Sequence, residues 1–159
     1  MPEAQIDRYK YQHLKGALSF IPYGCAVDEF QETVYDHPEM TPKQRLDLWK
    51  KLEQEYMPFR HYDNQSFLSE GRFWQRQTHI YKWPFYYIDY VLAQTCAFMY
   101  KIRMEEDRQA AWESYLRLCQ LSACKFYSDM LHTVGLEVPY EEGCIARMAE
   151  KLEELRKKM

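Results

Sequence analysis

A histidine followed by four tyrosines stands near the middle of the chain, at His79, Tyr81, Tyr86, Tyr87 and Tyr90. Packing of an apolar core alone would not select so many hydroxyl-bearing rings, because a phenol buried without a hydrogen-bond partner destabilises the fold. Histidine and tyrosine can both donate hydrogen bonds to an oxyanion that develops during a reaction. These residues therefore predict half of a site that binds a polar backbone, such as that of a peptide. The segment carries no group able to break the bond itself.

The simpler interpretation of the same residues is an aromatic core at the start of a helix. Against it, Tyr87 and Tyr90 fall outside the apolar stripe of the helix expected there. Their three-residue spacing also presents both hydroxyls on one helix face. His79, eight residues before Tyr87, lies in a loop expected to fold onto that helix start.

Other residues that could do chemistry are few. The chain has no HExxH, P-loop or GxGxxG motif. His61 with Asp63, and Asp129 with His132, could each offer two metal ligands, but a hydrogen-bonded turn and a solvated helix pair are simpler interpretations. The five cysteines are odd in number and lack CxxC spacing, which favours reduced thiols over a zinc or disulfide role.

The overall composition is that of a globular protein. The 159 residues fit one domain, with 47% apolar and 28% charged residues. The net charge of -3 gives no reason to expect a nucleic acid or an anionic membrane as partner. No apolar run is long enough to span a bilayer, and the first residues lack the features of a signal peptide. Together with reduced cysteines, these features favour a cytoplasmic protein.

The elements that must position the tyrosines are expected to be helices. Two helical stretches, 2–19 and 24–36, are predicted on either side of Pro22, which interrupts or kinks the chain. The segment from Thr41 to Gln44 has a capping-box pattern that starts a further helix, closed at Met57 and Pro58. Segment 59–83 shows no convincing period and is predicted to be a long loop-rich insert that lines a site.

The second half of the chain is also predicted to be helical. Pro84 opens the longest helix, which reaches about residue 105 or 107, and three more helices are predicted at 108–120, 122–134 and 141–159, with Ser122 as a cap and Gly135 as a stop. No segment alternates with a period of two for long enough to be a strand. The fold class is therefore all-α, in a single domain over residues 1–159.

Several motifs in the chain resemble those of a known enzyme family. They are IPYG (21–24), VDEFQ (27–31), GRFWQRQ (71–77), HIY (79–81) and PFYYIDY (84–90) leading to LAQ (92–94). Together they resemble the C-terminal part of oligoendopeptidase F and related thimet-type zinc metallopeptidases. The resemblance runs from Tyr9 to Gly143, which is most of the chain.

The resemblance implies a multi-helix lobe of a channel-type peptidase with one long lining loop. In such enzymes zinc is held by the two histidines of HExxH and a downstream glutamate, and a histidine and tyrosines from the C-terminal part face the metal. By position, this catalytic role falls to His79, Tyr87 and Tyr90, with Tyr81 and Tyr86 as substrate-binding neighbours. Lys82, Trp83 and Pro84 replace the glycine-richer stretch that the thimet branch has between the histidine and the tyrosines.

The zinc ligands and the general base implied by the resemblance would lie upstream of Met1. We therefore expect zinc in a full-length parent that cleaves oligopeptides, and neither zinc nor hydrolysis in this chain alone. Helices adapted to a missing N-terminal portion should also leave an apolar face exposed, which predicts binding of that portion or self-association.

Two other functions remain open on the sequence. The chain could be a stand-alone helical peptide-binding or interaction module that has no catalytic role. It could also be a scaffold half that completes an active enzyme when the other half is supplied.

Overall fold

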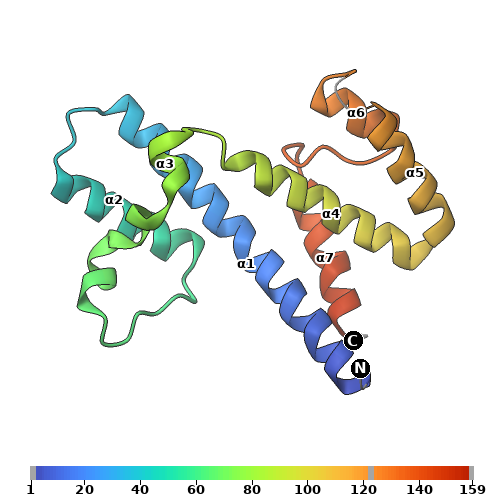
Figure 1. Ribbon diagram of the computed structural model, residues 1–159, viewed down its shortest axis with the longest axis horizontal. Helices are drawn as coiled ribbons and strands as arrows, with labels where there is room; N and C mark the ends of the chain where they lie inside the picture. Colours follow the sequence, from blue (N-terminus) through green and yellow to red (C-terminus); the bar gives the residue numbers. More distant parts are fainter. Residues whose placement is uncertain (1–2, 122–123, 158–159) are drawn as a thin grey trace. The chain divides into compact units, whose positions relative to one another are not determined.

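The computed structural model describes residues 3–121 and 124–157, and in these residues every regular element is helical. The all-α prediction is confirmed. In chain order the elements are α1 (Glu3–Asp36), α2 (Pro42–Tyr56), η1 (Leu68–Arg72), η2 (Phe73–Arg76), α3 (Thr78–Lys82), α4 (Ile88–Glu106), α5 (Arg108–Leu121), α6 (Tyr127–Thr133) and α7 (Cys144–Lys157) (Figure 1).

The chain divides into two compact units, Met1–Val91 and Leu92–Met159. The prediction of one domain stays a prediction, because compact units can be parts of one domain. No helix among the described residues is both long and apolar enough to cross a bilayer.

Helix α1 runs unbroken through Pro22, so the predicted division into two helical stretches is wrong. A proline inside a helix removes a single backbone hydrogen bond. The turn that follows Pro22 is held by burial, because Ala26, Val27 and Phe30 are all at most 1% exposed. The burial of these three side chains offsets the backbone hydrogen bond lost at Pro22. As a result, α1 is the longest of the described helices.

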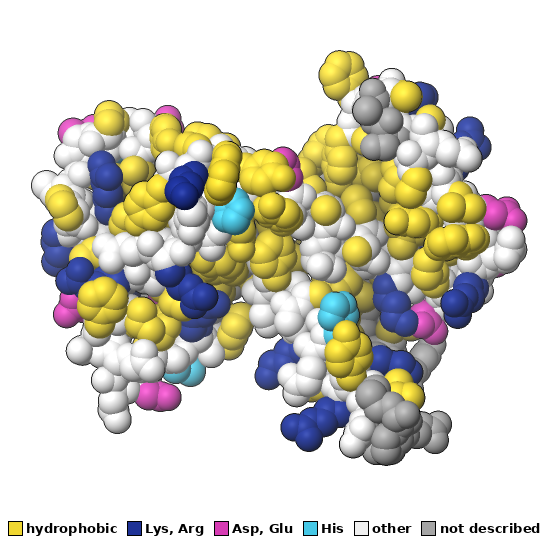
Figure 2. Space-filling view, in the orientation of Figure 1, with side chains coloured by type: hydrophobic (Ala, Val, Ile, Leu, Met, Phe, Trp, Pro, Cys, Tyr) yellow, Lys and Arg dark blue, Asp and Glu magenta, His cyan; other side chains and the backbone are white. Residues whose placement is uncertain are grey.

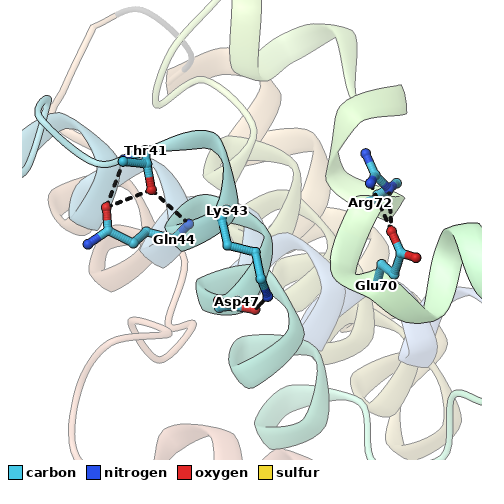
Figure 3. A network of polar contacts seen from close by, with 6 residues as sticks. All are labelled: Thr41, Lys43, Gln44, Asp47, Glu70 and Arg72. Carbon is cyan, nitrogen blue, oxygen red and sulfur yellow. Dashed lines mark hydrogen bonds and ion pairs between the residues drawn. The ribbon is translucent and has the colours of Figure 1, made fainter.

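Helix α2 begins at the predicted capping box (Figure 3). The Thr41 hydroxyl accepts a hydrogen bond from the Gln44 backbone N–H at 3.3 Å, and the Gln44 side chain accepts one from the Thr41 N–H at 2.8 Å. Two backbone N–H groups that the helix cannot satisfy are thereby paired. The helix ends with Met57 as its C-cap, as predicted.

The loop-rich insert is folded onto α2 by its glycine. Gly71 has φ 85, and a Cβ at this position would lie 2.2 Å from the Leu46 carbonyl oxygen. Only a residue without a side chain allows η1 to approach α2 this closely. The insert contains three short helical segments, η1, η2 and α3, rather than being loop throughout.

One apolar core holds α1, α2 and the insert together in the first unit. It consists of Tyr23, Ala26, Val27, Phe30, Trp49, Leu52, Met57 and Trp74, with Ile80 and Tyr87 among the partly buried residues packed against it. The tyrosine-rich segment is therefore anchored on α1 through its own side chains.

Helix α4 begins at Ile88, four residues later than predicted. The reason is Phe85, whose φ of 60 lies in the left-handed region and cannot continue a right-handed helix. The stretch between Pro84 and Tyr87 is therefore a turn, which brings its tyrosines back towards α3.

The second unit has its own core along the rest of α4 and helices α5 to α7. Thr95, Cys96, Met99 and Ile102 of α4 are buried, as are Leu131, Val138, Met148 and Leu152. Gly135 ends α6 with φ 73, as predicted, whereas α6 begins at Tyr127 and the predicted cap Ser122 lies outside the described residues.

Candidate functional site

His79 lies in α3 at the centre of a group of rings. Its ring centroid is 5.0 Å from that of Tyr87, 5.8 Å from that of Tyr90 and 6.2 Å from that of Tyr86. The phenol rings also meet one another, with 5.3 Å between Tyr86 and Tyr90 and 5.7 Å between Tyr87 and Tyr90. The structure thus brings together four of the five residues singled out in the sequence, and we call these four the His79 cluster.

The His79 cluster is open to solvent on one side. Tyr86 and Tyr90 are 46% and 41% exposed, and His79 and Tyr87 are half-buried. A ligand can therefore reach the rings without opening a sealed core.

Two phenols of the cluster, those of Tyr87 and Tyr90, are held in the protonated form. Burial raises the pKa of Tyr87 above its ordinary value, although the Arg76 cation opposes this shift. A hydrogen bond with Tyr86 raises the pKa of the Tyr90 hydroxyl, and burial acts in the same direction. Both hydroxyls therefore remain hydrogen-bond donors at neutral pH.

A hydrogen-bonded chain from α1 orients the imidazole of His79. The Tyr23 hydroxyl donates to Oε1 of Gln77 at 2.9 Å, and Nε2 of Gln77 lies 2.6 Å from Nδ1 of His79. With its oxygen occupied by Tyr23, the amide of Gln77 offers an N–H to Nδ1, so Nδ1 accepts and the ring proton resides on Nε2. His79 is thereby set as a neutral donor through Nε2.

Gln77 and Tyr23 were not among the site residues predicted from the sequence. Two signals could have indicated Gln77, because it stands two residues before His79 and ends the GRFWQRQ motif. Tyr23 belongs to the IPYG motif of the same resemblance, but it is 54 residues from Gln77 along the chain and nothing in the sequence shows that the two side chains meet.

Tyr87 is held in place by rings from α1. Its ring centroid lies 5.6 Å from that of Phe20 and 5.9 Å from that of Tyr23, both in edge-on geometry. Edge-to-face aromatic contacts of this kind are worth about 0.5–1.5 kcal/mol beyond the buried area. Helix α1 provides Tyr23, the first residue of the hydrogen-bonded chain to His79, and it also fixes Tyr87, the phenol nearest to the imidazole.

Tyr81, the fifth predicted residue, packs elsewhere. Its ring stacks on Trp74 with 5.9 Å between centroids and lines a pocket together with Phe30 and Ile80. Burial raises the pKa of its hydroxyl.

The described residues do not fit a zinc site. Within residues 3–121 and 124–157, no three His, Cys, Asp or Glu side chains gather in a way that could hold a metal ion. Nε2 of His132 lies 3.1 Å from the Glu141 carboxylate, and His61 and Asp63 line a polar pocket beside Glu53. The donor set of the described residues therefore offers no place for the metal that the resemblance implies.

Comparison with known proteins connects this geometry to a class of enzymes. No family model and no curated protein matches the chain. An X-ray structure assigned to oligoendopeptidase F matches with 44% sequence identity and a TM-score of 0.91. The structure of PZ peptidase A with inhibitor 2 matches with 42% identity and a TM-score of 0.90.

Both matches cover 96% of this chain, whereas the chain spans only 27% of the length of each matched structure. Sequence identity above 40% along nearly the whole chain, together with the shared fold, confirms the resemblance seen in the motifs. The chain is therefore a relative of oligoendopeptidase F-like peptidases, corresponding to about a quarter of their length.

Proposed function

We propose that this chain supplies the hydrogen-bond donors that hold the peptide backbone and stabilise the tetrahedral intermediate of an oligopeptide endopeptidase. In this proposal His79, Tyr87 and Tyr90 are the catalytic donors, and Tyr86 and Tyr81 are substrate-binding residues. The observation that carries it is the 2.6 Å contact between Gln77 and Nδ1 of His79, because it leaves Nε2–H free to donate.

The proposed chemistry follows from the charge that develops on the substrate. When the carbonyl carbon of a peptide bond is attacked, its oxygen becomes an oxyanion, and neutral donors already aimed at that oxygen stabilise the transition state more than the ground state. The imidazole of His79 and the two phenols are suited to this role because they bring donors without a net charge. Loss of one such donor typically lowers the rate by about 10²–10³.

The metal and the group that activates water belong, in this proposal, to the remainder of a peptidase. This chain covers only 27% of each matched chain, so most of their residues have no counterpart in it. Zinc, when bound there, would polarise the carbonyl and activate the attacking water.

Exposed apolar side chains support an association with that remainder. Trp112, Tyr115 and Leu116 of α5 are 47%, 39% and 43% exposed, and hydrophobic side chains are frequent on the visible surface in Figure 2. Large exposed apolar surface is commonly an interaction site.

The proposal is tested by supplying the rest of the enzyme. The 159-residue chain is mixed with a polypeptide corresponding to the remainder of a matched peptidase and with zinc, and cleavage of a quenched-fluorescent oligopeptide is followed. We expect chelator-sensitive cleavage from the mixture and none from the chain alone. His79→Leu should lower the rate of the mixture by about 10² or more, whereas His37→Leu, at an exposed histidine paired with Glu39, should not.

Chelator-sensitive turnover by the chain alone would contradict the proposal. The alternative function, a peptide-binding module without catalysis, predicts a different result in calorimetry. A module should bind a short peptide clearly and lose affinity in Tyr87→Phe and Tyr90→Phe, whereas donors aimed at a transition state should bind the ground-state peptide weakly.

A further inference from the structure

Exposed aromatic side chains are concentrated in the segment that holds the His79 cluster. Between residues 81 and 90, the rings that are 41% exposed or more belong to Tyr81, Trp83, Phe85, Tyr86 and Tyr90. Single apolar side chains on a surface are ordinary, whereas a contiguous group of them marks a binding surface. Trp83 and Phe85 have no role in the function proposed above.

Trp83 adjoins the imidazole of His79. The two ring centroids lie 5.8 Å apart with 51° between the planes, and the imidazole stacks in turn on Tyr86 at 6.2 Å. Phe85 packs elsewhere, on Tyr35 with 5.1 Å between centroids. Although it contacts the imidazole, Trp83 is 55% exposed, so much of its side chain remains open to a ligand. Trp83 therefore extends the ring surface of the His79 cluster.

The backbone of Trp83 is fixed on both sides. Its N–H donates to the His79 carbonyl at 2.9 Å, and its carbonyl accepts a hydrogen bond from the Tyr86 N–H at 3.3 Å. Pro84 follows, and a residue before proline avoids the helical region, as Trp83 does with φ -141 and ψ 71. An aromatic side chain on a fixed backbone loses little conformational entropy when it binds a ligand.

The position of Trp83 indicates which part of a peptide it would meet. In the proposed function His79 donates to the carbonyl oxygen of the scissile bond, so the side chains that flank this bond lie closest to the imidazole and to its neighbour Trp83. An indole face favours apolar and aromatic groups. The Lys82 ammonium lies 6.0 Å from the Trp83 ring centroid, so a second cation is disfavoured there by like-charge repulsion.

We propose that Trp83 is a specificity-determining residue, which binds an apolar or aromatic side chain flanking the scissile peptide bond. This role rests on the proposed function, because the latter makes the ligand a peptide substrate. Two simpler roles compete with it. Trp83 would only hold the imidazole of His79 in place, or it would contact the remainder of the peptidase.

The first experiment uses the 159-residue chain alone. The chain is titrated with N-acetyl-phenylalanine amide while the indole N–H of Trp83 is followed by ¹H–¹⁵N NMR, and Trp83→Phe identifies this signal among the four tryptophans. We expect a saturable shift, and at least about tenfold weaker binding of N-acetyl-alanine amide, which lacks the ring. No saturable shift, or equal affinity for the two amides, would overturn the proposal.

The second experiment measures substrate preference in the reconstituted peptidase. Two quenched-fluorescent peptides differ only in phenylalanine or alanine at a residue flanking the scissile bond, and each flanking position is varied in turn. Trp83→Ala should lower the ratio of kcat/KM for the phenylalanine peptide over the alanine peptide about tenfold, through a higher KM for the former. Phe59→Ala, at a 58% exposed ring of the same unit outside the cluster, should leave this ratio unchanged.

The competing roles predict different results for Trp83→Ala. An equal fall in kcat for both peptides, with the ratio preserved, would show that Trp83 only positions the imidazole. Weaker association in sedimentation velocity, with the ratio preserved, would place it against the remainder of the peptidase. Either result overturns the proposal. A mixture that cleaves neither peptide contradicts the proposed function instead, and the titration of the chain alone then decides whether Trp83 binds an apolar side chain.

Discussion

Nε2 of Gln77 lies 2.6 Å from Nδ1 of His79, while the oxygen of the same amide accepts a hydrogen bond from Tyr23. The amide therefore links a phenol on α1 to an imidazole on α3 and assigns the proton of the imidazole to Nε2. Gln77 is a positioning residue in this arrangement, because it acts on a substrate only through His79.

Replacing Gln77 by glutamate should reverse the tautomer of His79. A carboxylate accepts hydrogen bonds but cannot donate them, so Nδ1 would carry the proton and Nε2 would become an acceptor. The ¹⁵N chemical shifts of the imidazole distinguish the two tautomers directly. In the reconstituted peptidase, we expect Gln77→Glu to lower the rate by about 10² or more.

The matched control is Gln75→Glu, which adds the same charge at an exposed neighbouring position. It should leave both the tautomer and the rate unchanged. A His79 that keeps its Nε2 proton in Gln77→Glu would show that the amide does not orient the ring.

Tyr87→Phe and Tyr90→Phe remove one hydroxyl each while they keep the ring contacts. Each substitution should lower kcat of the reconstituted peptidase by about 10²–10³ with a smaller change in KM, because the hydrogen bond is made to the transition state. Tyr140→Phe serves as control, since Tyr140 is 67% exposed and lies in the other unit. Rates of both variants within a factor of two of the wild type would exclude the hydroxyls from catalysis.

The stability of the fold should fall at high pH through Tyr23. Burial, and the neighbouring Tyr87, raise the pKa of Tyr23 to about 12, from 10.0. Between these values the unfolded chain releases the proton and the folded chain keeps it, so the free energy of unfolding decreases as the pH rises from about 10 to about 12. Two pKa units correspond to at most about 3 kcal/mol.

Urea unfolding of the wild type and of Tyr23→Phe over this pH range checks the effect. The phenylalanine variant should show a smaller decrease in the free energy of unfolding, because the titrating group is absent. Parallel pH profiles for the two proteins would show that Tyr23 is not responsible.

Gly71→Ala should destabilise the first unit by about 2 kcal/mol or more. Alanine at this position would have to keep a φ near 85, which L-residues rarely adopt. Its Cβ would lie 2.2 Å from the Leu46 carbonyl oxygen, a backbone atom that cannot move aside easily. Thermal unfolding followed by circular dichroism measures the change.

Gly16→Ala is the control for that substitution. Gly16 lies within α1, and apart from the neighbouring backbone of the helix itself no atom would lie within 4 Å of an added Cβ. This change should stabilise the chain slightly, by up to about 1 kcal/mol, because alanine favours the helix. Similar effects of the two substitutions would mean that the close approach of η1 to α2 is unimportant for stability.

Trp112→Glu should weaken association with the remainder of a peptidase. Trp112 is 47% exposed on α5, and a charge there would have to be desolvated in an interface. Sedimentation velocity on the mixture measures the complex, with Glu113→Gln on the same helix as a control for a change of charge. A clean monomer in the wild-type mixture would remove the basis for this interface.

Local signals along the chain were enough to predict most of the helices. The capping box at Thr41 and Gln44 and the stop at Gly135 act over three or four residues, so neighbours in the sequence decide them. The motif around His79 also predicted a family, and the comparisons with solved structures agree with it.

Where the sequence misled, packing at a distance overrode a local preference. Pro22 should interrupt a helix, yet burial of Ala26, Val27 and Phe30 carries α1 through it. Pro84 should start a helix, yet the left-handed backbone of Phe85 delays α4 until Ile88.

For the site, the residue types were visible in the sequence but their orientation was not. His79 and its tyrosines are close along the chain, so their clustering could be anticipated, although His79 lies in the short helix α3 and not in the predicted loop. The tautomer of His79 depends on Tyr23, which is 54 residues from Gln77 along the chain. Only the tertiary structure brings such groups together, because a hydrogen bond depends on distance in space and leaves no period in the sequence.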